Sequence, residues 1–213
     1  MRPTNIYAMN RPALLLVLVL PLVFPGCLGQ KTIVQQYYIL EAGVYDSNDS
    51  VRPSPLPLRC LVQATEVDKA YAGTRIASRV QSNEIAYFQN HQWAARPEYY
   101  FTQIITDFFD NQGVFLETTG RILVGRPDVL LSTRIHNVEM VVSQRAVSAR
   151  LNLEFQLTDA SSGMVVVQHK SDRTKSMEDR SMNQFANMIG EMLSEELTAL
   201  MVLIRGADWP ERK

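Results

Sequence analysis

A strict alternation of apolar and polar residues runs through residues 147–158, which read VSARLNLEFQLT. The odd-numbered positions are apolar and the even-numbered positions are polar. Because successive side chains of a β-strand point to opposite faces, this pattern predicts an antiparallel strand with one buried face and one wet face. The turn sequence DASSG at residues 159–163 leads into a valine run at residues 165–167, which predicts a second strand paired with the first.

We expect residues 129–142 to form a third strand, which pairs with the other edge of the strand at residues 147–158. Its apolar parity changes between Ile135 and Val138, so we expect a β-bulge near His136 or Asn137. Further strands are expected at residues 35–40, at residues 58–64 and from residue 114 onward, together with a hairpin formed by residues 74–80 and 84–90.

Two stretches have the three-to-four spacing of amphipathic helices. The first opens at Pro97, and Gly113 is its expected C-terminal cap. The second covers about residues 179–205, with Ser176 or Ser181 as its N-terminal cap. The elements together predict an α+β fold, a small mixed or antiparallel sheet packed by two or more helices.

The N-terminal residues have the features of an export signal. Arg2 and Arg11 precede an apolar stretch at residues 13–24, which is too short to cross the roughly 30 Å hydrocarbon core of a membrane. Gly26 and Cys27 follow, and a small residue before a cysteine ends the signals of bacterial lipoproteins, in which that cysteine is lipidated. The alternative is an ordinary signal peptide with an incidental cysteine. Leu28 stands where an aspartate would favour retention in the inner membrane, so we expect the outer membrane.

These features predict four segments. Residues 1–26 are expected to be the signal peptide, 27–36 a tether, 37–206 a single α+β domain and 207–213 a tail.

Composition excludes some classes of function. The net charge is −1, and without residues 1–26 the chain has 19 basic and 22 acidic residues. A mildly acidic domain with no basic block lacks the electrostatic footprint of a nucleic-acid-binding protein. With Cys27 lipidated, Cys60 has no disulfide partner, and its apolar surroundings favour a buried inert thiol over a reactive one.

No motif in the chain points to catalysis. There is no Gly-rich phosphate loop, no CxxC and no HExxH, and the three histidines stand alone in the sequence. We therefore predict no catalytic residue, no metal and no cofactor. The acidic residues of the last helix are expected on its solvated face: Glu191, Glu195 and Glu196.

Three consecutive aromatic residues lie in the first predicted helix: Tyr99, Tyr100 and Phe101. Consecutive residues occupy more than one face of a helix, so at least one of the three should be exposed. The triplet is our candidate interface, and the alternative is that all three pack internally.

Two stretches resemble a known family. The sequence YYIL at residues 37–40 follows soon after Cys27, and residues 76–97 read IASRVQSNEIAYFQNHQWAARP. Together with the helix and the GVF sequence that follow, they resemble the ABC-type transport auxiliary lipoproteins, PqiC-like proteins that accompany MCE-type lipid transport systems. The resemblance covers about residues 37–204, most specifically 76–116. Ala95 and Arg96 depart from it, since the family usually has an acid there.

The resemblance implies a fold like that of the N-terminal domain of TolB, with these residues in structural roles: Tyr38, Arg79, Tyr87, Trp93 and Pro97. It also implies a non-enzymatic lipoprotein on the periplasmic side of a Gram-negative outer membrane. Such a protein docks on or completes a conduit made by an MCE-domain protein, and self-association is compatible with that role. Two alternatives are a subunit of a secretion or pilus machine and a periplasmic enzyme with an unmarked site.

Overall fold

The structure is a computed structural model, which describes residues 34–42, 53–120, 125–144 and 146–209. The described residues from Gln35 to Trp209 form one compact unit. The expected signal peptide, Cys27 and most of the expected tether lie outside the described residues.

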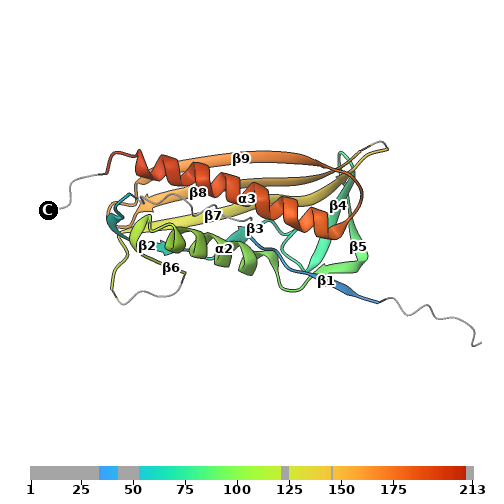
Figure 1. The fold of residues 1–213 in the computed structure, drawn as a ribbon, viewed down its shortest axis with the longest axis horizontal. Helices are drawn as coiled ribbons and strands as arrows, with labels where there is room; N and C mark the ends of the chain where they lie inside the picture. Colours follow the sequence, from blue (N-terminus) through green and yellow to red (C-terminus); the bar gives the residue numbers. More distant parts are fainter. Residues whose placement is uncertain (1–33, 43–52, 121–124, 145, 210–213) are drawn as a thin grey trace, which may run out of the picture. The chain divides into compact units, whose positions relative to one another are not determined.

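Three long antiparallel strands form the centre of the fold (Figure 1). They are β7 (Val129–Val142), β8 (Val147–Asp159) and β9 (Val165–Met177), and β8 lies between the other two. The register of β7 against β8 shifts between Ile135 and Asn137. The bulge predicted from the change of parity is thus confirmed.

The second edge of β7 pairs with three short strands in succession. They are β2 (Leu56–Val62), β3 (Glu66–Val67) and β4 (Arg75–Gln81), all parallel to β7. The remaining strands extend this side of the sheet: β6 (Phe115–Thr119) pairs with β2, β5 (Glu84–Trp93) with β4, and β1 (Gln36–Tyr38) with β5. Over the residues that the structure describes, the result is one mixed sheet of nine strands.

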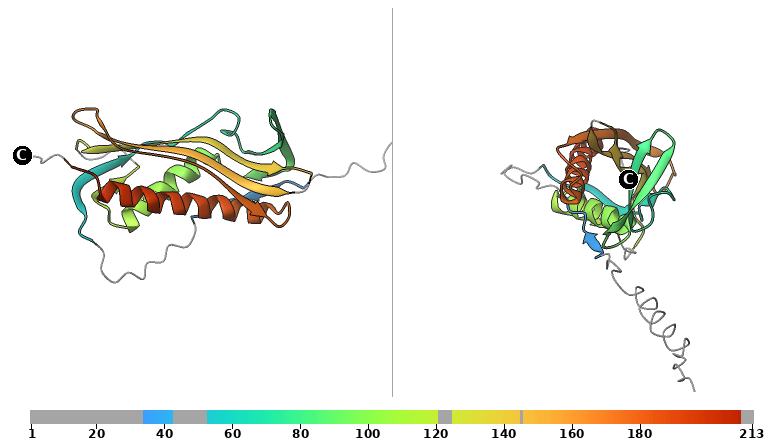
Figure 2. Two further views of the ribbon diagram at one scale, coloured as in Figure 1. Left: turned by 90° about the horizontal axis from the view of Figure 1, so that it is seen from above. Right: turned by 90° about the vertical axis from the view of Figure 1, so that its right-hand side faces the viewer.

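In the described part of the chain, two helices lie on the same face of this sheet, which curves around them (Figure 2). Helix α2 covers Pro97–Asn111 and helix α3 covers Met182–Arg205. Gly113 follows α2 with a φ of 56°, a conformation that glycine adopts without steric cost. Of the two predicted caps of α3, Ser181 is the correct one, because its side chain accepts a hydrogen bond from the backbone N–H of Gln184.

The core lies between the sheet and the two helices. The odd-numbered side chains of β8 face it and are almost fully buried, as the alternation predicted: Ala149, Leu151, Leu153, Phe155 and Leu157. Apolar stripes on α2 and α3 cover them, including Phe101, Phe108, Phe185 and Leu197. The fold class is therefore α+β, as expected.

Several expected boundaries were wrong. Strand β9 was expected only at residues 165–167, yet it extends to Met177. Its later residues are mostly polar, and polar side chains give no burial signal. Strand β3 was not expected, and α3 begins at Met182 rather than near Asp179.

Candidate partner-binding site

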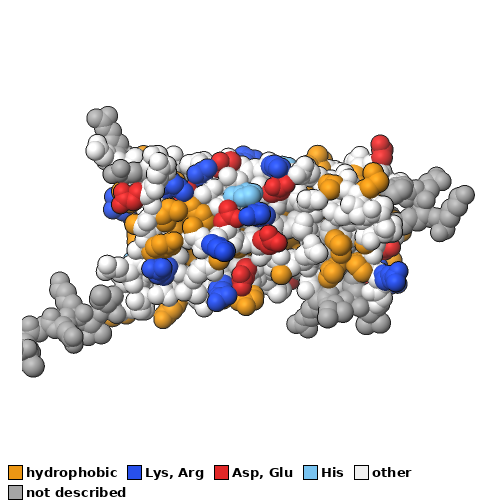
Figure 3. All heavy atoms as spheres, turned by 180° about the vertical axis from the view of Figure 1, so that it is seen from behind, with side chains coloured by type: hydrophobic (Ala, Val, Ile, Leu, Met, Phe, Trp, Pro, Cys, Tyr) orange, Lys and Arg blue, Asp and Glu red, His pale blue; other side chains and the backbone are white. Residues whose placement is uncertain are grey.

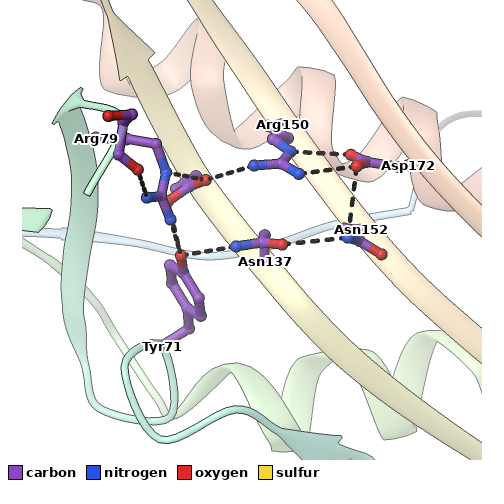
Figure 4. Close-up of polar contacts among 8 residues, drawn as sticks. Tyr71, Arg79, Asn137, Arg150, Asn152 and Asp172 are labelled. Carbon is purple, nitrogen blue, oxygen red and sulfur yellow. Dashed lines mark hydrogen bonds and ion pairs between the residues drawn. The ribbon is translucent and has the colours of Figure 1, made fainter. Parts of the chain in front are cut away.

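A buried carboxylate joins the strands at one end of the sheet (Figure 4). Glu139 of β7 has no exposed surface. Its Oε1 accepts hydrogen bonds from Arg79 of β4 at 2.8 Å and from Arg150 of β8 at 3.2 Å. Its Oε2 accepts one from the hydroxyl of Tyr71 at 2.7 Å. A buried charge is tolerated when opposite charges and hydrogen bonds surround it, and Glu139 has both.

Further contacts extend this cluster toward the edge strand (Figure 4). Arg150 binds Asp172 of β9 through two hydrogen bonds of 2.9 Å and 2.8 Å, and this contact lowers the pKa of Asp172. Asn137 donates to the hydroxyl of Tyr71 at 2.8 Å. Burial and the hydrogen bond to Glu139 raise the pKa of Tyr71 above its usual range. The cluster is balanced in charge and links four strands, so it is a structural brace.

Arg79, one of the residues that the resemblance placed in a structural role, is at the centre of this brace. Besides Glu139, it donates to the backbone carbonyl of Ser82 at 2.8 Å and to the hydroxyl of Tyr71 at 2.9 Å. The planar guanidinium thereby fixes strand β4, the turn that follows it and the loop that precedes it.

Tyr38 and Tyr87 hold neighbouring segments at the same end of the domain. The hydroxyl of Tyr38 lies 3.0 Å from Nδ1 of His91, which connects β1 to β5. The hydroxyl of Tyr87 donates to the carbonyl of Ala70 at 3.0 Å, and the guanidinium of Arg75 lies 4.3 Å from the centre of its ring. The two tyrosines therefore hold β5 against β1 on one side and against the loop that contains Ala70 on the other.

Trp93 and Pro97 connect this end of the sheet to the helices. Trp93 is 3% exposed, and its ring centre lies 5.9 Å from that of Phe185 on α3. Its backbone N–H donates to the carbonyl of Thr74 at 2.7 Å. Pro97 is the first residue of α2, where its missing N–H removes no hydrogen bond.

The aromatic triplet is divided between the core and the solvent. Phe101 is fully buried, Tyr100 is half-buried and Tyr99 is 62% exposed. Tyr99 lies in the first turn of α2, close along the chain to Ala94, whose N–H donates to the carbonyl of Tyr38 in β1. Tyr99 is therefore the member of the triplet that a partner could contact.

The face of the sheet opposite the helices carries charged side chains across its middle, with apolar side chains toward both ends (Figure 3). Arg134 lies 3.0 Å from Asp68, and Lys170 lies 3.2 Å from Glu154. A hollow of about 520 Å³ lies among them, with largely polar walls. Since these charges pair with one another, this face is a solvated surface.

A second buried carboxylate corrects a sequence-based expectation. Glu196 was expected on the solvated face of the last helix, but it is 2% exposed. It lies 2.6 Å from Nε2 of His169 and accepts a hydrogen bond of 2.6 Å from Arg173, both on β9. The spacing of Glu196 from Leu193 and Leu200, which belong to the apolar stripe, is the signal that could have placed it toward the sheet.

The described part of the chain contains no group of three His, Cys, Asp or Glu side chains that could hold a metal ion. Burial raises the pKa of the Cys60 thiol to about 12, so this side chain stays protonated and unreactive. Neither of the helices in the described ranges has the length and apolarity that a membrane crossing requires.

The sequence of residues 45–200 matches the model of the family described as the ABC-type transport auxiliary lipoprotein component. The chain belongs to this family. The resemblance inferred from residues 37–40 and 76–97 is thereby confirmed. No curated protein matches the chain.

Solved structures with the same fold support the architecture. Protein XCC0632 from Xanthomonas campestris, of the family DUF330, has a TM-score of 0.68 at 18% identity, covering 80% of this chain and 96% of its own. A crystal structure of an uncharacterized protein has a TM-score of 0.63 at 12% identity, covering 80% of this chain and 99% of its own. At these identities the similarity shows the fold alone.

Proposed function

We propose that this family member is a non-enzymatic lipoprotein of the outer membrane that docks on or completes the periplasmic conduit of an MCE-type lipid transport system. The observation that carries the proposal is the family match over residues 45–200. The arrangement of the described residues favours binding over chemistry, because arginines engage the buried carboxylates of Glu139 and Glu196, and Ser161 and Ser162 engage that of Asp159. An exposed tyrosine in the first turn of α2 offers a contact for a partner.

Lipidation of Cys27 would hold the domain near its target. A tether raises the effective concentration of the domain at a periplasmic conduit, so a modest intrinsic affinity is sufficient. Several acyl chains on one cysteine give stable anchoring where a single chain is marginal.

Metabolic labelling with a palmitate analogue tests the anchor. The native protein and a Cys60→Ser variant should both incorporate the label, because Cys60 is fully buried, whereas Cys27→Ser should not. Equal labelling of Cys27→Ser and the native protein would exclude Cys27 as the attachment site.

Tyr99 is the proposed contact with the MCE-domain protein. Tyrosine is enriched at interface hot spots, because a large ring and a polar tip can be buried together. Tyr99 is 62% exposed, and Val202 of α3 is 64% exposed. Because the two positions are equally accessible but lie on different helices, Val202 is a matched control for Tyr99.

Photo-crosslinking in cells tests this contact. A photoreactive phenylalanine analogue at residue 99 should capture an MCE-domain protein, and the same analogue at residue 202 should capture less of it. Capture of secretin or pilus components at residue 99, without an MCE-domain protein, would instead assign the chain to another envelope assembly.

A further inference from the structure

The edge of the sheet at β1 carries no formal charge. No Lys, Arg, Asp or Glu occurs from Gln35 to Leu40 or from Ile85 to Trp93, the segments that form β1 and most of its neighbour β5. The edge at β9 is different, because it includes charged side chains: Lys170, Asp172, Arg173 and Lys175. Residues 35–40 can therefore leave bulk water without the cost of removing a charge from it, and the first charged side chain after them is that of Glu41.

Two large side chains project from this uncharged edge. Tyr37 and Ile39 are 64% and 53% exposed, while the intervening Tyr38 is half-buried and Leu40 is buried. The alternation places Tyr37 and Ile39 on the outward side of the segment. We call this pair the β1 surface.

Hydrogen-bonding groups lie beside the β1 surface. A hollow of about 410 Å³ lies between Tyr37 and Ile39 and the start of α3, and Asn183, Asn187 and one carboxylate, that of the exposed Glu41, also line it. Amide groups can donate to phosphate and ester oxygens, and tyrosine favours the boundary between water and hydrocarbon. Apolar side chains flanked by amide donors suit the interfacial region of a lipid leaflet, where the carboxylate of Glu41 would stay among the hydrated headgroups.

The chain limits how far the β1 surface can lie from the proposed lipid anchor. Seven residues lie between Cys27 and Gln35, and the eight Cα-to-Cα steps of a fully extended chain span at most about 29 Å. The β1 strand begins at the next residue, Gln36. An anchored Cys27 therefore keeps the β1 surface close to the leaflet that holds its acyl chains.

We propose that the β1 surface, Tyr37 and Ile39, rests on the lipid leaflet that holds the anchor, so that the domain has a fixed orientation on the membrane. This inference rests on the proposed lipidation of Cys27 but not on the identity of the transport partner. In this arrangement the β1 surface contacts lipid, and Tyr99 remains available to contact the protein partner.

Fluorescence of the lipidated full-length protein in vesicles of phosphatidylethanolamine and phosphatidylglycerol tests the proposal. An environment-sensitive nitrobenzoxadiazole label is attached to Ile39→Cys or, as a control, to Val202→Cys. Helix α3 ends close to Val202, at the opposite end of the domain from β1 (Figure 1). Cys60 is fully buried, so it does not take the label.

The emission of the Ile39→Cys probe should shift to shorter wavelength and be quenched by doxyl-labelled lipid, while the Val202→Cys probe should do neither. Adding Tyr37→Ser to the Ile39→Cys protein should reduce the quenching, and a probe at Tyr37→Cys repeats the test if Ile39→Cys does not fold. No quenching at either position, or equal quenching at both, would overturn the proposal. Flotation separates the two levels of failure, because protein that does not float with the vesicles lacks the anchor itself.

Discussion

The two faces of the β7–β8–β9 layer differ in composition, and a buried glutamate is a notable exception at each. The face toward the helices is apolar, with Leu151, Leu153 and Leu157 of β8 at most 1% exposed. The opposite face is polar, yet it holds the fully buried Glu139. The apolar face, in turn, meets the buried Glu196 of α3. The alternation along a strand decides which face a side chain points to, but the segments that cover that face decide whether it is buried.

A large effect is expected at the exception on the polar face. Glu139→Gln removes the charge that compensates Arg79 and Arg150, so the variant should lose about 3 kcal/mol of unfolding free energy in urea. We place the loss at the low end of the range for buried pairs, because both arginines keep some contact with water.

Asp172→Asn is the control for this variant, because Asp172 also pairs with Arg150 but is about half exposed. The same acid-to-amide change there should cost about 1 kcal/mol or less. Equal losses in the two variants would mean that Glu139 is in contact with water.

Truncation on the apolar face should have an effect of similar size. Leu153 is 1% exposed, so Leu153→Ala leaves a cavity and should cost about 2–5 kcal/mol in urea melts. A native-like stability of this variant would show that the inner face of β8 is not closed by the helices.

The contribution of Glu196, the exception at the apolar face, to the free energy of unfolding should depend on pH. Burial alone would raise the pKa of Glu196, but hydrogen bonds from His169, Ser171 and Arg173 outweigh burial and hold this pKa below its usual value. A depressed folded-state pKa adds stability above the unfolded-state pKa, and this stability is lost as the pH falls through the folded-state pKa.

Glu196→Gln should therefore be about 2 kcal/mol less stable than the native protein at neutral pH. The difference should shrink as the pH falls below 4.5, the ordinary value of a glutamic acid. Asp172 and Glu154 also have lowered pKa values, but they are present in both proteins and cancel in the comparison. A difference that stays constant down to about pH 3 would show that the charge of Glu196 contributes nothing.

The smallest effect is expected one residue from Leu153. Glu154 points to the polar face, where Gln168 and Lys170 contact it near the solvent. Glu154→Ala should change the unfolding free energy by about 0.5 kcal/mol or less. If Glu154→Ala cost more than Leu153→Ala, the register of β8 would be shifted by one residue.

The sequence was most informative where burial follows a regular period. The alternation in β8, the change of parity in β7 and the apolar stripe that follows Pro97 each predicted the observed element. The second half of β9 could not be predicted in this way. Its inward positions include His169, Arg173 and Lys175, which face carboxylates of α3 rather than leucines.

The site was less predictable than the fold. The partners of Glu139 come from two other strands and from a loop, and those of Glu196 lie more than twenty residues away along the chain. Such pairs leave no local pattern in a single sequence. The structural roles expected of Arg79, Tyr87 and Trp93 were inferred from the resemblance, and the contacts of these residues appear only in three dimensions.

The short pairing of β1 has a mechanical consequence. Tension on the chain ahead of Gln36 enters the domain through β1, which is bound to β5 over three residue pairs, Gln36 to His91, Tyr37 to Gln92 and Tyr38 to Trp93. Strand β7, by contrast, is bound to β8 from Val129 to Val142 and to three further strands along its other edge. Under such a pull β1 should separate from β5 first, which lengthens the linker ahead of the domain while the rest of the sheet stays folded. A short strand pairing thus lies where a pull on the N-terminal side would arrive, and it can open and re-form while the long pairings of β7 stay closed.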